Sequence, residues 1–270
     1  MPVHSFSSLS STVATLRRAG CVFAEDEAEL LHTTAASPDE LAAMVERRVA
    51  GLPLEHVLGW AEFCGRRFAV DAGVFVPRRR TEFLVAQAAG LAPDRAVVVD
   101  LCCGTGALGV VLAATLDRVE LHACDVEPAA VRCARHNVGD LGRVYRGDLF
   151  DPLPAALRGR VDVLLANVPY VPTADVELLP AEARVHEPRV ALDGGGDGLD
   201  VMRRVAAEAP GWLAPGGSLL VEASERQRDA AVRVLRDAGL APRVVDCEEL
   251  YATVVIGTAG AGPVKAGRVT

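Results

Sequence analysis

The chain has 270 residues, of which half are hydrophobic and only 4% aromatic, and its formal net charge is −8 with a pI near 5.3. A chain of this length can bury a full core, and a composition dominated by alanine and valine is typical of a parallel sheet covered by helices. The acidic balance argues against a general affinity for nucleic acid, which needs a basic surface, and suits a partner with a basic face.

Seven cysteines are scattered along the chain, several of them in apolar runs. Their odd number and the lack of a C-x-x-C pair with matching partners predict reduced thiols in the core and no metal site. The sequence shows no charged-then-apolar leader and no apolar run that could span a bilayer, so we expect a cytoplasmic protein. The cysteines are Cys21, Cys64, Cys102, Cys103, Cys124, Cys133 and Cys247.

The N-terminal part of the chain predicts a small bundle of short helices. Ser37, followed by Pro38 and Glu40, has the pattern of a helix N-cap with a capping box. We expect a helical substrate-docking domain over residues 1–52 and a β-hairpin linker over residues 53–80. The expected helices are Ser7–Ala19, Asp26–His32 and Leu41–Ala50, and the extended pieces of the linker are Val57–Phe63 and Arg67–Val70.

From residue 81 strands and helices alternate, which is the pattern of an α/β domain with a Rossmann-like sheet. We expect this domain to cover residues 81–258 and a flexible tail to follow over 259–270. The expected strands are Ala96–Leu101, Val119–Asp125, Val144–Arg146, Val161–Ala166, Gly217–Ala223, Arg243–Cys247 and Ala252–Ile256, and the expected helices are Thr81–Ala89, Ala107–Leu116, Pro128–Val138, Leu199–Ala209 and Arg226–Ala238.

A glycine turn joins the first expected strand of this domain to its helix. Gly104, Gly106 and Gly109 also satisfy the G-x-G-x-x-G spacing of dinucleotide sites, so the turn alone does not select the ligand. Asp100 ends the strand just before the turn, where its carboxylate would repel a pyrophosphate but could bind the cationic amino group of a methionine moiety. The segment resembles the acidic-x-G-x-G-x-G turn of S-adenosylmethionine enzymes, with Cys102 at the first glycine.

Two further carboxylates follow the next two expected strands. Asp125 is placed for a ribose diol, which both cofactor classes require, and Asp148 is placed for adenine. Solvated carboxylates in ordinary turns are the alternative, but three at successive strand ends favour a ligand site. The predicted cofactor-binding residues are Asp100, Cys102, Cys103, Gly104, Thr105, Gly106, Asp125, Val126, Asp148, Leu149 and Asn167.

The fourth expected strand delivers Asn167, Val168, Pro169 and Tyr170, which we assign to catalysis and substrate binding. The segment resembles the N-P-P-Y signature of methyltransferases that alkylate amide or exocyclic amino nitrogens. An amide nitrogen is a poor nucleophile, so the asparagine oxygen and the next backbone carbonyl would hold its NH₂ group and direct the lone pair. A polar turn at the end of a strand is the alternative reading.

Three other segments carry a wider resemblance, to the protein-(glutamine-N5) methyltransferases that act on release factors or on a ribosomal protein. The likeness runs from about Gly51 to Ile256 and implies a helical docking domain, a seven-stranded class I methyltransferase domain and S-adenosylmethionine as donor. It adds Arg78 and Thr81 as substrate-binding candidates. The segments are Gly51–Gly59 with Ala61–Phe63, Val76–Glu82 as V-P-R-R-R-T-E, and Glu187–Gly195 with Asp197–Leu199.

The chain also departs from that family's pattern. Val168 replaces the first proline of N-P-P-Y, Arg79 and Arg80 replace Pro and Glu, and the N-terminal bundle is short. These differences leave glutamine chemistry intact, because Val168 still offers a backbone carbonyl. They favour a related N-V-P-Y group with an unassigned protein substrate over the release-factor enzymes themselves.

Four other functions remain as alternatives. An N6-adenine nucleic-acid methyltransferase shares the reaction motif but would need a basic groove. A methyltransferase of a small-molecule amide or amine, a non-catalytic cofactor-binding module and a nicotinamide-dependent oxidoreductase are the others. We expect a protein partner that carries the target glutamine, such as a release factor or ribosomal protein, with no membrane and no direct nucleic-acid partner.

Overall fold

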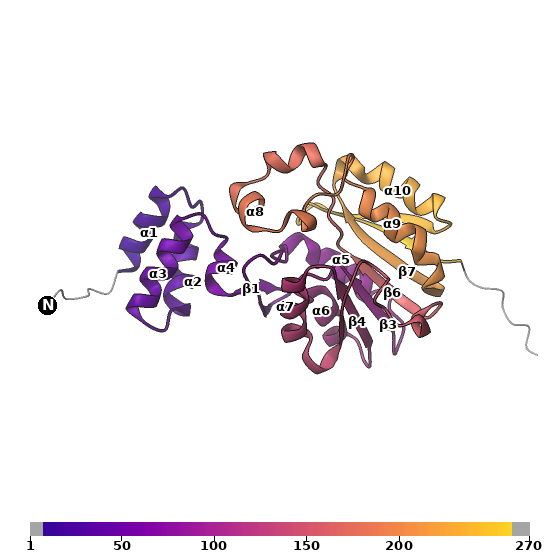
Figure 1. The fold of residues 1–270 in the computed structure, drawn as a ribbon. Helices are drawn as coiled ribbons and strands as arrows, with labels where there is room; N and C mark the ends of the chain where they lie inside the picture. The colour runs from indigo at the N-terminus through magenta and orange to yellow at the C-terminus, as the bar shows by residue number, and fades with distance from the viewer. Residues whose placement is uncertain (1–7, 261–270) are drawn as a thin grey trace, which may run out of the picture.

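The N-terminal helices form a unit of their own in the computed structural model, which describes residues 8–260. Figure 1 shows these helices set beside the larger sheet domain. Leu16, Leu31, Leu41, Met44 and Val57 share a separate apolar core there. The helices are α1 (Leu9–Arg18), α2 (Ala24–Thr34), α3 (Pro38–Val49) and α4 (Leu54–Leu58).

Two sequence predictions for this region are corrected. Ser37 does cap α3 by accepting from the Glu40 backbone N–H at 3.2 Å, but the Glu40 carboxylate binds the Ala36 N–H and leaves the capping box incomplete. Val57 and Leu58 are helical rather than extended, because they bury an apolar side of α4 before Gly59 ends it at a φ of 79°. The predicted start of the first helix at Ser7 lies outside the described residues.

The expected hairpin follows directly. Strands β1 (Trp60–Phe63) and β2 (Arg66–Ala69) pair antiparallel around a tight turn. Phe63 and Phe68 pack edge to face at 6.4 Å and attach the hairpin to the core of the sheet domain. The hairpin therefore belongs structurally to the larger domain, while α4 belongs to the bundle.

The larger domain is a seven-stranded sheet with the order β5-β4-β3-β6-β7-β9-β8, in which only β9 runs antiparallel to its neighbours. Chain order reverses between β3 and β6, and ligands bind at the carboxyl ends of the strands at such a switch point. The strands are β3 (Val97–Leu101), β4 (Glu120–Asp125), β5 (Gly142–Arg146), β6 (Val161–Ala166), β7 (Leu213–Ala223), β8 (Ala241–Cys247) and β9 (Ala252–Thr258).

Helices cover both faces of this sheet. Helices α5 and α6 pack on one face through Leu84, Leu108 and Leu112, and α9 and α10 pack on the other through Met202 and Leu235. The all-buried pattern of β3 is what a central parallel strand requires. The helices are α5 (Glu82–Ala89), α6 (Ala107–Thr115), α7 (Pro128–Val138), α9 (Asp200–Glu208) and α10 (Arg228–Asp237).

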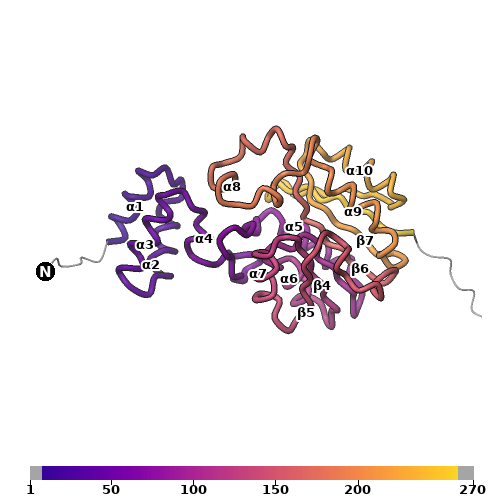
Figure 2. The backbone as a smooth tube through the Cα atoms, viewed as in Figure 1, coloured from indigo at the N-terminus to yellow at the C-terminus, as the bar shows by residue number. Residues whose placement is uncertain are grey.

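The segment between β6 and α9 was not predicted to contain regular structure. It holds the 3₁₀ turn η4 (Thr173–Leu178), the short helix α8 (Ala181–His186) and the 3₁₀ turn η5 (Arg189–Ala191). Figure 2 shows it reaching from the sheet towards the N-terminal helices. Four other 3₁₀ turns are η1 (Arg79–Thr81), η2 (Gly139–Leu141), η3 (Ala155–Leu157) and η6 (Ala209–Gly211), and a further one, η7 (Glu225–Gln227), precedes α10.

A buried arginine joins the bundle to this segment. Arg48 of α3 binds the buried Glu27 carboxylate at 2.7 Å and reaches Glu182 of α8 at 2.8 Å. Because Arg48 is almost fully enclosed, losing either carboxylate would leave its charge poorly compensated. The bundle thus contacts the segment between β6 and α9.

The start of the predicted tail lies against the sheet. Ala259 donates to the Gly217 carbonyl at 2.9 Å and accepts from the Gly216 N–H, so it extends the pairing of β9 with β7 by one residue. The rest of the predicted tail, from residue 261, lies outside the described residues. Over residues 8–260 no helix combines the length and apolar character that crossing a membrane requires.

Candidate active site

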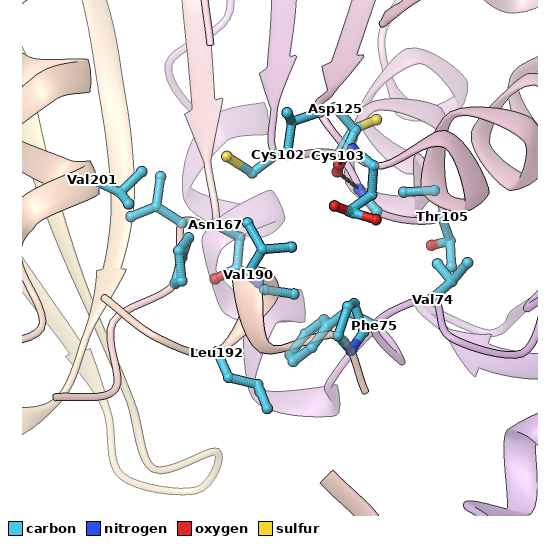
Figure 3. Close-up of a pocket in the computed structure, with 18 of the residues that line it drawn as sticks. Val74, Phe75, Cys102, Cys103, Thr105, Asp125, Asn167, Val190, Leu192 and Val201 are labelled. Carbon is cyan, nitrogen blue, oxygen red and sulfur yellow. Dashed lines mark hydrogen bonds between the residues drawn. The ribbon is translucent and has the colours of Figure 1, made fainter. Parts of the chain in front are cut away.

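A cavity of about 440 Å³ opens at the carboxyl ends of β3, β4, β5 and β6. In the view of Figure 3, Cys102, Cys103 and Asp125 lie across the opening from Phe75 and Leu192, with Asn167 between them. Residues from the linker before α5 and from the segment after β6 form the remaining walls. The switch point of the sheet and the cavity therefore coincide, as this topology requires.

Asp100 lies at the bottom of the cavity and is only 1% exposed. Its Oδ2 accepts from the Gly109 N–H of α6 at 3.0 Å, whereas its Oδ1 is buried and has no hydrogen-bond partner among residues 8–260. Burial raises the pKa of this carboxyl to about 7, the Gly109 N–H opposes the shift, and the Asp125 charge adds to it. An unpartnered buried oxygen of this kind fits a cationic donor from a ligand.

The glycine turn keeps the backbone close to the cavity. Gly104 has a φ of 54° and donates its N–H to Asp125 Oδ2 at 2.9 Å. Cys102, where the resembled motif has glycine, also has a positive φ of 53°, a conformation that costs a side chain free energy. Gly106 is the N-cap of α6, and a Cβ there would lie 3.1 Å from Val138 of α7, so it serves helix packing rather than the cavity.

Asp125 ends β4 with both oxygens already bonded to backbone. Its Oδ2 accepts from Gly104 and its Oδ1 accepts from the Glu127 N–H at 2.9 Å, which fixes the carboxylate at the cavity wall. Burial raises its pKa, and these N–H groups oppose the shift. Each oxygen keeps a second lone pair, so the carboxylate can still accept from a ligand's hydroxyl groups.

The next strand end presents Asp148 at the rim. Its carboxylate pairs with Arg204 of α9 at 2.6 Å, and both side chains are about half exposed. An exposed pair of this kind contributes little stability. Leu149 has a φ of 47°, and its carbonyl accepts from the Cys124 thiol at 3.0 Å, so the backbone beside the cavity is strained but held.

The reaction motif follows β6. Val168 is 3% exposed and packs in the main core, while Asn167 lies at the cavity with no hydrogen bond from its side chain to another residue of 8–260. Two glycines let the next loop close over the motif. A Cβ on Gly194 would lie 2.6 Å from the Pro169 carbonyl oxygen, and one on Gly198 would overlap the Tyr170 carbonyl, so neither position tolerates a side chain.

Arg78 fastens that loop from the other side. Its guanidinium binds both oxygens of the buried Glu187 carboxylate at 2.6 Å, and Glu187 also accepts from the Val76 N–H at 3.1 Å. Burial raises the pKa of Glu187, with Arg78 opposing the shift. Arg78 also lines the cavity, so this ion pair joins the linker before α5 to the segment after β6 at the cavity wall.

The structure brings most of the predicted site residues to one cavity. Of the candidates, only Gly106 and Thr81 are absent from its lining, and Thr81 is buried where its hydroxyl donates to Glu222 at 2.7 Å. Sequence reasoning missed the residues of the outer wall, because no local motif marks them. Those that line the cavity include Val74, Phe75, Arg80, Leu179, Glu182, Val190, Leu192, Val201 and Arg204. No cluster of histidine, cysteine or carboxylate side chains among residues 8–260 could hold a metal ion.

Comparison with known proteins supplies the family. The profile described as the methyltransferase small domain matches residues 66–201, about half of the chain. A release factor glutamine methyltransferase of Geobacter sulfurreducens is 40% identical over 75% of this chain and 72% of its own length. One of Moorella thermoacetica is 41% identical over 72% of this chain and 70% of its own length.

Solved structures give the same fold at much lower identity. A methyltransferase from Pyrococcus furiosus superposes with a TM-score of 0.55 at 14% identity, over 81% of this chain and 98% of that one. At such identity the likeness shows the fold alone, and it confirms the predicted class I methyltransferase architecture.

The residues at the strand ends fit the cofactor of that family. The unpartnered Asp100 oxygen suits an amino cation, Gly104 leaves room where a Cβ would meet only the Phe75 carbonyl at 3.9 Å, and Asp125 suits a diol. With the family profile and the relatives, these features show that the chain belongs to the protein-(glutamine-N5) methyltransferases, whose methyl donor is S-adenosylmethionine.

Proposed function

We propose that this protein methylates the side-chain amide nitrogen of a glutamine in a protein substrate. The observation that supports it most is the free Asn167 side chain, which lies in the same cavity as the Asp100, Gly104 and Asp125 end of the sheet. A cofactor half and an amide-binding half thus share one space, as transfer between two bound molecules requires.

Four residues would hold the donor. Asp100 would accept from its amino group, Gly104 would let it approach the turn, Asp125 would accept from its ribose hydroxyls, and Asp148 would lie beside the base. When bound there, S-adenosylmethionine supplies an electrophilic methyl group. The thiols of Cys102 and Cys103 are protonated, since burial raises their pKa values well above the ordinary range, so they do not compete as nucleophiles.

The acceptor is held by the reaction motif. The Asn167 side-chain oxygen and the Val168 carbonyl would each accept from the glutamine NH₂ group and hold its nitrogen in line with the methyl group. Tyr170 would form the wall beside it, and its phenol stays protonated because burial raises its pKa. The gain comes from placement and orientation, which can supply several orders of magnitude in rate.

The relatives' names point to a release factor as the first protein to test. The N-V-P-Y sequence, Arg79 and Arg80 still predict a protein substrate other than a release factor. We also propose a cytoplasmic location, where both kinds of substrate would be found. The acidic chain, with a net charge of −8, supports a protein substrate over nucleic acid.

The deciding experiment incubates the purified protein with isotopically labelled S-adenosylmethionine and a bacterial cell lysate, with a purified release factor assayed alongside. We expect label on one glutamine, located by fragment mass spectrometry. Label on DNA or RNA in place of protein would overturn the proposal, and so would label on a residue other than glutamine.

A further inference from the structure

A buried carboxylate holds the phenol of Tyr170. Glu222 is the next-to-last residue of β7, beside the reaction motif, and is 4% exposed. Its Oε1 accepts from the Tyr170 hydroxyl at 2.8 Å and from Arg80 Nε at 2.9 Å, and its Oε2 accepts from the Thr81 hydroxyl at 2.7 Å. The Tyr170 oxygen in turn accepts from Arg80. Every bond of the phenol is thus satisfied by groups from β7 and from the linker before α5.

The other end of the same residue is held by Gln227. Its Nε2 donates to the Tyr170 carbonyl at 2.8 Å and to the Asp197 carbonyl at 3.0 Å. Its Oε1 accepts from the Ser224 N–H at 3.2 Å and from the Ser224 hydroxyl at 2.7 Å, which fixes the Gln227 side chain in a capping box. The segment 222–227 therefore hydrogen-bonds both the hydroxyl and the backbone carbonyl of Tyr170.

From this geometry we infer that Glu222 and Gln227 are positioning residues that fix Tyr170 as the wall of the acceptor site. The inference rests on the proposed function, since it concerns where the glutamine amide is held. Tyr170 lines the cavity directly, whereas Glu222 and Gln227 are absent from its lining and act through Tyr170. Neither residue was among the sequence candidates.

Stability alone does not account for this arrangement. Desolvating a carboxylate costs several kcal/mol. An apolar side chain of similar volume in the same place commonly gives the folded protein equal or greater stability. The three donors that offset this cost come from Arg80, Thr81 and Tyr170, and all three belong to segments at the acceptor end of the cavity. Arg80 is about half exposed and also borders a second hollow behind Glu222, so it forms the solvent side of the cluster.

The test compares Glu222→Ala, Glu222→Gln, Gln227→Ala and Tyr170→Phe, singly and with Glu222→Ala and Tyr170→Phe combined. For each variant, kcat and KM are measured on the unmethylated protein substrate, and the affinity for S-adenosylhomocysteine is measured by calorimetry. Asp162→Asn is the matched control, because this carboxylate is also a hydrogen-bond acceptor, from the Val97 N–H at 2.8 Å, but lies at the amino end of β6, away from the cavity. Local hydrogen exchange of the peptide around Tyr170 is measured in all variants.

We expect Glu222→Ala and Gln227→Ala to lower kcat/KM by about 10-fold to 100-fold, the usual effect of misplacing a positioned group. Cofactor affinity should stay within about twofold, since the cofactor end of the cavity is untouched. Glu222→Gln should recover most of the loss, because its amide oxygen can still accept from the Tyr170 hydroxyl. In the Tyr170→Phe background, Glu222→Ala should add little.

Several results would overturn the inference. The first is an unchanged kcat/KM in Gln227→Ala and in whichever Glu222 variant folds. The second is a loss of kcat/KM in the Glu222→Ala, Tyr170→Phe double variant that equals the two single losses combined. The third is a loss of cofactor affinity as large as the loss of kcat/KM. If the wild type methylates no glutamine, the proposed function fails by itself. The positioning role of Glu222 and Gln227 is then judged by hydrogen exchange, and it fails if exchange around Tyr170 is no faster in Glu222→Ala or Gln227→Ala than in Asp162→Asn.

Discussion

The cofactor end and the acceptor end of the cavity are built in different ways. At the cofactor end, Gly104 and Asp125 are 21 residues apart and are joined by one backbone hydrogen bond at adjacent strand ends. At the acceptor end, Thr81 and Glu222 are 141 residues apart, and Arg78 and Glu187 are 109 apart. The first is a local consequence of strand, turn and helix, whereas the second exists only once the whole sheet has formed.

This difference predicts how each end responds to change. The cofactor end uses backbone groups and carboxylates that stay in place when one side chain is altered, so single substitutions there should weaken binding by a limited amount. The acceptor end depends on side-chain contacts between distant segments, so small displacements should act on the chemical step. Changes at Asn167, Asp125, Asp100 and Val168 test that division.

The largest effect is expected from Asn167→Ala. Its side chain has no partner among residues 8–260, so its removal should leave the fold intact while the glutamine NH₂ group loses an acceptor. We expect kcat to fall by at least about 100-fold, with cofactor affinity within a few-fold of wild type. Steady-state kinetics and calorimetry measure the two. Asn167→Asp keeps an acceptor oxygen and should retain more activity than Asn167→Ala. An equal fall in cofactor affinity and rate would move Asn167 to the cofactor end.

A smaller effect is expected from Asp125→Ala. Losing the carboxylate leaves ligand hydroxyls and the Gly104 N–H without an acceptor, so S-adenosylhomocysteine binding should weaken by about 1–3 kcal/mol. Calorimetry measures this loss directly. Asp140→Asn, an exposed carboxylate in the turn after α7, serves as the control and should bind normally. Unchanged affinity in Asp125→Ala would mean that the donor does not lie against β4.

How far the sequence could predict the molecule follows the same division. The bounds of Pro128–Val138 and Val161–Ala166 were predicted to the residue, because a proline at the start and a glycine after the end mark the helix and a buried apolar run marks the strand. The strand-end carboxylates were found for the same reason. Glu222 and Gln227 were not found, since a buried acid at the end of a strand has no local signature until its partners are brought to it. Thr81 was misplaced at the cavity because motif proximity does not show which way a side chain points.

A pH dependence should appear at Asp100. Its pKa of about 7 lies above the ordinary 3.8, so the folded protein holds a proton there that the unfolded chain releases between these values. The contribution of Asp100 to the free energy of unfolding of the ligand-free protein is therefore greatest at low pH and is lost as pH rises towards 7. Ligand affinity runs the other way, because only the carboxylate binds an amino cation well.

We expect the affinity for S-adenosylhomocysteine to rise roughly tenfold between about pH 6 and pH 7.5, following ionisation of one group with a pKa near 7. Calorimetry over this range tests it. Asp100→Asn should bind more weakly at neutral pH and show a flat profile. A wild-type profile that is equally flat would show that the carboxylate is already ionised at pH 6 or does not meet the amino group.

The smallest effect is expected from Val168→Pro, which restores the first proline of the resembled motif. Proline fixes φ near −65° and removes an N–H, but Pro169 already restricts Val168 to an extended conformation, and burial at 3% exposure holds it there. The direction of the Val168 carbonyl should therefore change little, and kcat/KM on a release factor should shift by less than about threefold. The measurement is a side-by-side assay of both forms on the same release factor, with thermal melting to register the lost packing of the valine. Efficient methylation by both forms would assign release factors as substrates of this chain. Efficient methylation only by Val168→Pro would show that this one residue sets substrate choice, which contradicts the expected shift of less than about threefold and a role for Arg79, Arg80 and the short N-terminal bundle.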